Sequence, residues 1–107
     1  MRRRGDVPSW VEETVRALMR GAPARELYIY KNPSDGNKIT RHYREIDCAI
    51  ERGLSSVCCP AEADIIRRAI IGRVGYDGIY GFPGGRNRFY AIRQRVISAI
   101  ARELNYI

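Results

Sequence analysis

The C-terminal segment, residues 86–107, contains the side-chain types that proteins use to contact DNA. Arginine pairs with guanine, and the amides of asparagine and glutamine pair with adenine, through two hydrogen bonds each. Because the major groove is only about 12 Å wide, a helix that enters it needs polar or small residues on its outer side. We expect base contacts from the outward positions of its first turns, namely Arg86, Asn87, Tyr90, Ala91 and Gln94. Backbone phosphates are expected to meet Arg88, Arg95, Ser98 and Arg102.

The apolar residues of the same segment recur at helical spacing and set the phase of this helix. The apolar stripe consists of Phe89, Ile92, Val96, Ile100 and Ile107, with Ile97 and Leu104 at its edge. Gly84 and Gly85 precede the helix and are expected to form a hinge that lets its start approach DNA closely, because glycine has no side chain. A C-terminal helix with a solvated basic face is the alternative, and it explains the pattern equally well.

The charge balance of the whole chain favours a polyanionic partner. Its 19 Lys+Arg residues exceed its 12 Asp+Glu residues, which gives a formal net charge of +7. Nearly all of this positive charge is arginine, since Lys31 and Lys38 are the only lysines. Nucleic acid is the first expectation, because arginine suits phosphate and base-edge contacts. A membrane is not expected, since no apolar run approaches the roughly 20 residues that a spanning helix needs.

No set of residues suggests catalysis, a metal or a cofactor. His42 is the only histidine, and the segment "GFPGGRNR" lacks the Lys-Ser/Thr ending of a nucleotide-binding phosphate loop. Cys48, Cys58 and Cys59 have no CxxC spacing and are expected to be free thiols that act as small buried apolar residues. The N-terminal residues 1–10 do not resemble a signal peptide. We therefore expect a cytoplasmic protein that is not an enzyme.

The elements that must position the C-terminal helix are also predicted to be helical. Periodic apolar residues indicate helices over 9–21, 38–54 and 60–74, and "PARELYIYKN" (23–32) is assigned to a helix although a strand fits its composition. Ser9 is the expected cap of the first helix, and Gly53 is expected to end the third. Residues 75–85 form a glycine-rich connector with one distorted helical turn around Ile79 and Tyr80.

These elements predict one small all-α domain over residues 1–107. Residues 1–36 would be an N-terminal helical segment. Residues 37–107 would be a helix-turn-helix-like DNA-binding portion, with a glycine-rich turn before the last helix.

The sequence "FPGGRNRFYAIRQRVISAIARELNYI" (82–107) resembles the C-terminal signature of the RinA/ArpU-type transcriptional regulators of phages and prophages. The residues that match this signature are Arg86, Phe89, Tyr90 and Arg93, followed by Ile97, Ala101 and Leu104. The resemblance implies an all-helical, sequence-specific DNA-binding regulator of phage or prophage genes in a bacterial host cell. It also implies a C-terminal half similar to the promoter-reading helix-turn-helix of a sigma factor. The glycine-rich stretch 75–85 departs from that pattern, because such a turn follows a regular helix.

The alternative function is that of a small adapter protein that binds host transcription or phage packaging machinery, which includes small-terminase-like DNA recognition. Five tyrosines would suit a protein interface as well as half-buried packing. They are Tyr28, Tyr30, Tyr76, Tyr80 and Tyr106. The expected partners are thus double-stranded DNA and, for either function, host RNA polymerase. A homodimer is expected if the DNA site is palindromic.

Overall fold

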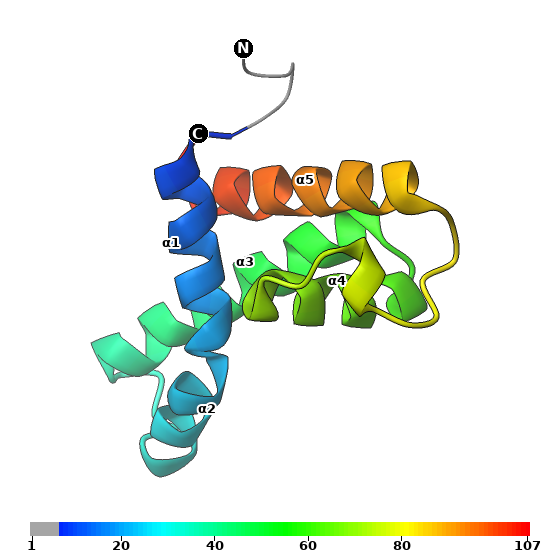
Figure 1. Cartoon of the computed structure of the whole chain (residues 1–107). Coiled ribbons are helices and arrows are strands. Elements are labelled where there is room, and N and C mark those ends of the chain that lie inside the picture. The colour runs from blue at the N-terminus through cyan, green and yellow to red at the C-terminus, as the bar shows by residue number, and fades with distance from the viewer. Residues whose placement is uncertain (1–6) are drawn as a thin grey trace.

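The computed structural model describes residues 7–107, and within this range the chain contains helices and turns but no strand. The helices are α1 (Ser9–Arg20), α2 (Ala22–Lys31), α3 (Lys38–Val57), α4 (Pro60–Gly72) and α5 (Arg86–Glu103), with a short 3-10 turn η1 (Tyr76–Gly78) (Figure 1). The all-α prediction is confirmed. The ambiguous stretch 23–32 is helical, and the glycine-rich connector before α5 spans residues 73–85.

The long helices α3 and α5 form the centre of the molecule and share its most extensive packing. Figure 1 shows α5 along one side of the bundle, α4 beside α3, and α1 crossing their end. The short helix α2 packs against α1 and α3 and projects, with the start of α3, away from the body. The connector 73–85 approaches α5 from the other end of the bundle, so α2 and the start of α5 lie far apart (Figure 1).

The buried core is apolar and draws on every helix of the body, but not on α2. The largest fully buried side chains in this core are Val11, Val15, Met19, Leu54, Ile66, Ile70, Phe89, Val96, Ile97 and Ile100. From α2 only Arg25 is buried, and its Nε donates to Asp47 Oδ1 at 2.8 Å. The helices α1, α3 and α4 therefore all pack against the apolar face of α5.

Gly53 does not end the third helix, contrary to the prediction, because α3 continues through it to Val57. A glycine inside a helix costs about 1 kcal/mol relative to alanine, so its presence needs a packing reason. That reason is close approach: a Cβ at Gly53 would lie 2.4 Å from Ile100 Cγ1 and 2.9 Å from Ile100 N. The missing side chain allows α3 and α5 to touch along their backbones.

The predicted cap of the first helix is also wrong. Ser9 is already helical, and the cap residue is Pro8, whose carbonyl accepts hydrogen bonds from Val11 N and Glu12 N. Among residues 7–107, no side chain caps α1. A side-chain cap is found on α3, where the side-chain oxygen of Asn37 accepts hydrogen bonds from Ile39 N at 2.9 Å and from Thr40 N at 3.1 Å.

Candidate nucleic-acid interface

The first turns of α5 present the side chains that were predicted to read bases. Four of these residues are exposed and one is half-buried; the exposed ones are Arg86, Asn87, Tyr90 and Ala91, and Gln94 is the half-buried one. Asn87, Ala91 and Gln94 lie at positions i, i+4 and i+7 and so share one side of the helix. Neither amide side chain has a hydrogen bond within residues 7–107, so both are available to a ligand.

Three arginines form a line along the same exposed side of α5, which we call the arginine ridge. Arg88, Arg95 and Arg102 follow one another at intervals of seven residues, which is close to two helical turns, or a rise of about 10 Å. All three are exposed, and the small Ala91 and Ala99 lie between them. Arg95 and Arg102 form no ion pair within residues 7–107 and therefore present uncompensated positive charge.

Ser98 does not belong to this exposed side, and its assignment as a phosphate contact is corrected. The residue is only 8% exposed, because the second half of α5 is covered on more sides than the first half. Ile97 and Ala101 beside it are completely buried. Ser98 therefore offers very little surface to a ligand that lies along the ridge.

Arg86 and Arg88 are bound to acidic side chains of the protein itself. Arg86 pairs with Asp77 at 2.6 Å, and its guanidinium lies 5.5 Å from the centre of the Tyr76 ring. Arg88 pairs with Glu62 at 2.5 Å and donates to the carbonyl of Pro83 at 3.3 Å. For these two arginines, a DNA contact requires a change of partner or the use of a remaining N–H group.

The Glu62–Arg88 pair fastens the start of α5 to the start of α4. Glu62 is only 5% exposed and also accepts a hydrogen bond from Cys59 N at 3.3 Å. The hydrogen bond from Arg88 lowers the pKa of the Glu62 carboxyl, against the opposite effect of burial. Arg88 is thus a structural residue as well as a member of the ridge. The sequence pattern contained no signal for this pairing, because the two residues are 26 positions apart in the chain.

The two glycines before α5 differ in what they do. Gly84 has a φ of +145°, and a Cβ there would lie 2.5 Å from Arg88 Cδ, so a side chain would displace the arginine that locks the connector. Gly85 is the N-cap of α5 in an extended conformation, and nothing lies within 4 Å of the place where its Cβ would be. Within the described part of the chain no side chain caps α5, so the first backbone N–H groups of the helix have no side-chain acceptor there. The predicted hinge motion itself stays a prediction.

A cluster of rings attaches the connector to α5. Phe89 is completely buried, and three rings surround it, with centroid distances of 5.8 Å to Tyr76, 5.4 Å to Phe82 and 4.9 Å to Tyr90. Tyr76 N donates to the Tyr90 hydroxyl at 3.2 Å, and the Tyr76 hydroxyl donates to the Gly84 carbonyl at 3.3 Å. The one helical turn of the connector is at Tyr76–Gly78, slightly before the predicted position.

The cysteines are all free thiols, but only one of them is a buried residue. Burial raises the pKa of the Cys58 thiol to about 11, with the nearby Glu62 carboxylate adding to the effect. Cys48 and Cys59 are exposed. Within residues 7–107 no three Cys, His, Asp or Glu side chains are grouped in a way that could hold a metal ion.

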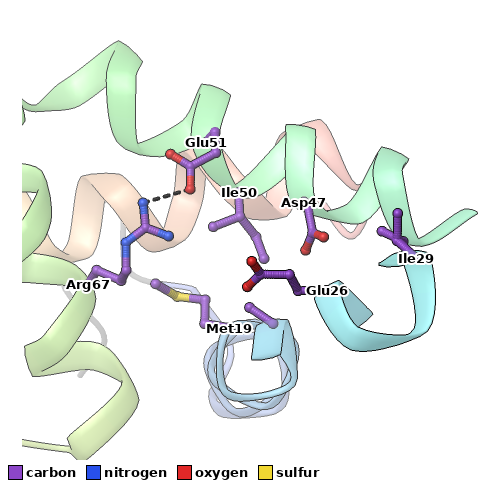
Figure 2. Close-up of a pocket in the computed structure, with 8 residues that line it drawn as sticks. Met19, Glu26, Ile29, Asp47, Ile50, Glu51 and Arg67 are labelled. Carbon is purple, nitrogen blue, oxygen red and sulfur yellow. Dashed lines mark hydrogen bonds and ion pairs between the residues drawn. The ribbon is translucent and has the colours of Figure 1, made fainter. Parts of the chain in front are cut away.

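A second surface feature is a pocket of about 310 Å³ between α1, α2, α3 and α4. It is lined by Met19, Ala22, Glu26, Ile29, Asp47, Ile50, Glu51 and Arg67, and Figure 2 shows the carboxylates of Glu26, Asp47 and Glu51 among its apolar side chains. Glu51 accepts from Arg67 at 2.6 Å, and Asp47 accepts from the buried Arg25 at 2.8 Å. Glu26 alone has no ion pair within the described part of the chain. Most of the negative charge here is therefore neutralised by the protein.

Comparisons with known proteins returned no matching family model, no similar curated protein and no similar solved structure. Among residues 7–107, no helix combines the length and the hydropathy that crossing a bilayer would take. The resemblance of residues 82–107 to the RinA/ArpU-type regulators thus remains a prediction.

Proposed function

We propose that this protein is a sequence-specific DNA-binding regulator whose helix α5 lies in the major groove. The observation that carries the proposal is the exposed side of α5, where the amides Asn87 and Gln94 lie beside the arginine ridge that contains the unpaired Arg95 and Arg102. Arginines without an internal partner attract phosphates, and amides without a hydrogen bond are suited to adenine edges.

The geometry of α5 supports different roles for the first and the second half of the helix. Its first half carries Asn87, Ala91 and Gln94 on one side, and small Ala91 leaves room for a base pair between the two amides. The second half offers only a narrow exposed strip, which contains Arg102. We propose that the first half reads bases and that Arg95 and Arg102 hold the phosphate backbone, which fixes the position of the helix.

The turn before α5 differs from that of a simple helix-turn-helix. Such a motif joins its helices by about 3–4 residues. Here residues 73–85 separate α4 from α5, and the more extensive partner of α5 is α3. The proposed reading helix is therefore held by α3, by the ring cluster around Phe89 and by the Glu62–Arg88 pair.

The proposal is tested by selecting bound sequences from a pool of random DNA duplexes. A recovered consensus of several base pairs is the expected result, and DNA affinity should fall steeply with salt, because each neutralised phosphate contributes a slope of about 0.9. Recovery of no consensus, or affinity that is insensitive to salt, would contradict the proposal. Control of phage or prophage genes, contact with host RNA polymerase and a location in the bacterial cytoplasm rest on the resemblance alone.

The second candidate function is that of an adapter protein, and the observation that favours it is the apolar surface of α2. Leu27 and Tyr30 lie one turn apart on this projecting helix and are both exposed. Aromatic and aliphatic side chains exposed in this way are typical of protein interfaces. A pull-down of host transcription or packaging components that depends on Leu27 but not on Arg95 would favour the adapter.

A further inference from the structure

Tyr80 is the most exposed large apolar side chain within residues 7–107, with 96% of its surface accessible. Its neighbours are arranged differently: Ile79 and Phe82 are half-buried against the core. Gly81 follows Tyr80 directly and has a φ of +78°, a conformation that favours glycine and turns the chain back toward the core. The connector therefore turns two apolar side chains inward and holds one aromatic ring in solvent.

This ring belongs to a segment that is fastened on both sides. Before it, Asp77 pairs with Arg86 at 2.6 Å, and Tyr76 N donates to the Tyr90 hydroxyl at 3.2 Å. After it, Phe82 packs edge-on against Phe89 at 5.4 Å. The Tyr76 hydroxyl, which donates to the Gly84 carbonyl, closes the segment. The exposure of Tyr80 is thus a fixed feature of an anchored loop.

Folding gives no reason for an aromatic ring at this position, because the ring contacts almost nothing in the chain. Its place along the chain does suggest a role, since Tyr80 lies five positions before Gly85, the N-cap of α5, and this stretch spans at most about 18 Å. The only charged side chain of residues 75–85 is Asp77, which Arg86 neutralises. A DNA backbone beside α5 would therefore meet no uncompensated negative charge from this loop.

We infer that Tyr80 is a second, apolar contact with the same DNA, in which its ring packs on a base or sugar next to the segment covered by α5. The inference rests on the proposed function and deepens it, because it assigns the glycine-rich loop a place in the interface. A ring that packs on a sugar or wedges into a base step of a duplex buries apolar surface without neutralising a phosphate. This contact should therefore add affinity without adding to the salt dependence.

The test is a titration of the selected duplex with Tyr80→Ala and Tyr80→Phe at several salt concentrations. We expect Tyr80→Ala to bind about 5- to 100-fold more weakly, with an unchanged salt slope and an unchanged melting temperature. Tyr80→Phe keeps the ring and should bind like the wild type. The matched control is Tyr30→Ala, which removes another strongly exposed tyrosine (82% exposed) from the distant helix α2 and should not change DNA affinity.

Wild-type affinity in Tyr80→Ala would overturn this inference while leaving the proposed function in place. A reduced salt slope in Tyr80→Ala would also overturn it, because the effect would then come from lost phosphate contacts. An equal loss in Tyr30→Ala would show that the tyrosines do not act locally, and would reject the inference too. If the wild-type protein bound no duplex at all, both the proposed function and the role of Tyr80 would be wrong.

Discussion

The exposed side of α5 and the pocket beside α2 are both charged surfaces over apolar residues, but they differ in how much of their charge the protein neutralises. In the pocket, Asp47 is paired with Arg25 and Glu51 with Arg67. On α5, Arg95 and Arg102 have no ion pair within residues 7–107. Paired charges largely cancel at a distance, whereas unpaired ones of the same sign add to a field that attracts an anion. This difference is why we place the proposed DNA contact on α5.

The two surfaces also differ in how firmly they are built. The start of α5 is fixed by a buried ring, a buried carboxylate and hydrogen bonds from the connector. The pocket is bordered by α2, which contributes only Arg25 to the buried residues of the chain. A reading surface must hold its helix in place before the ligand arrives, because ordering a helix on binding costs affinity. The predictions below test this contrast, beginning with the largest expected effect.

Phe89→Ala should destabilise the protein by about 3–5 kcal/mol, because it empties the centre of the ring cluster. Phe89 has no exposed surface and contacts three rings, including Phe82 of the connector. Chemical denaturation monitored by circular dichroism measures the effect. The control on the other surface is Glu51→Gln, which breaks an exposed ion pair and should cost less than about 1 kcal/mol. Equal losses in the two variants would remove the contrast between the surfaces.

Gly53→Ala should destabilise the protein by about 1–3 kcal/mol, because the added Cβ pushes α3 away from α5. The clash is with backbone atoms of Ile100 as well as its side chain, so rotation of one side chain cannot relieve it. Gly85→Ala is the matched control, since its Cβ meets nothing within 4 Å and should change stability by less than about 1 kcal/mol. If Gly53→Ala were as stable as the wild type, α5 would be able to shift on α3 without a loss of stability.

Arg88→Ala should destabilise the protein by about 1–3 kcal/mol at neutral pH, because it leaves the buried Glu62 carboxylate without its main partner. The bond from Arg88 lowers the pKa of Glu62 in the folded state. The stability that the Glu62 carboxylate contributes is therefore present when the pH lies above the pKa of Glu62 in the unfolded chain. It is lost as the pH falls through the pKa of Glu62 in the folded protein. The difference between wild type and Arg88→Ala should shrink over that acidic range. Urea denaturation at a series of pH values measures this.

Arg67→Ala removes the corresponding arginine from the pocket and serves as the control for Arg88→Ala. Its partner Glu51 is exposed and water can replace the lost bond, so the cost should stay below about 1 kcal/mol at every pH. A pH-dependent loss in Arg67→Ala as large as that in Arg88→Ala would contradict the comparison.

Thiol labelling should give the smallest and most local signal. Cys59, at the start of α4, and Cys48, on α3 next to Asp47, are exposed and should react quickly. Burial raises the pKa of Cys58 to about 11. Only the thiolate reacts, so this thiol should be modified about 100-fold more slowly at neutral pH. A time course followed by mass spectrometry distinguishes two fast sites from one slow site. Three equally fast sites would mean that the corner between α3 and α4 opens readily.

The sequence was sufficient to predict the helices and most of their buried residues. Phe89, Ile92 and Val96 recur at helical spacing, and this spacing correctly indicated the buried side at the start of α5. It failed at Ser98, because periodicity gives the direction of a side chain but not the number of neighbouring helices that cover it. Gly53 was misread for a related reason, since a glycine at a helix crossing and one at a helix end look alike in one sequence.

The partners of the arginines could not be predicted at all. Asp77 and Glu62 are separated from Arg86 and Arg88 along the chain, and no spacing rule connects them. The exposure of Tyr80 depends on ring packing and hydrogen bonds that form only once the connector has folded onto α5. The general position of the candidate interface on α5 followed from the sequence. The acidic partners of its arginines and the place of the connector beside it became visible only in the three-dimensional contacts.

The most direct test of the central proposal is the affinity of Asn87→Ala and Arg95→Ala for the selected duplex and for a scrambled duplex at one salt concentration. Asn87→Ala should lose about 1–3 kcal/mol on the selected duplex and much less on the scrambled one, because a base contact is removed. Arg95→Ala should weaken both duplexes nearly equally, as the loss of a phosphate contact does. If Asn87→Ala lost the same affinity on both duplexes, α5 would be a general basic surface and the proposed reading of DNA sequence would be wrong.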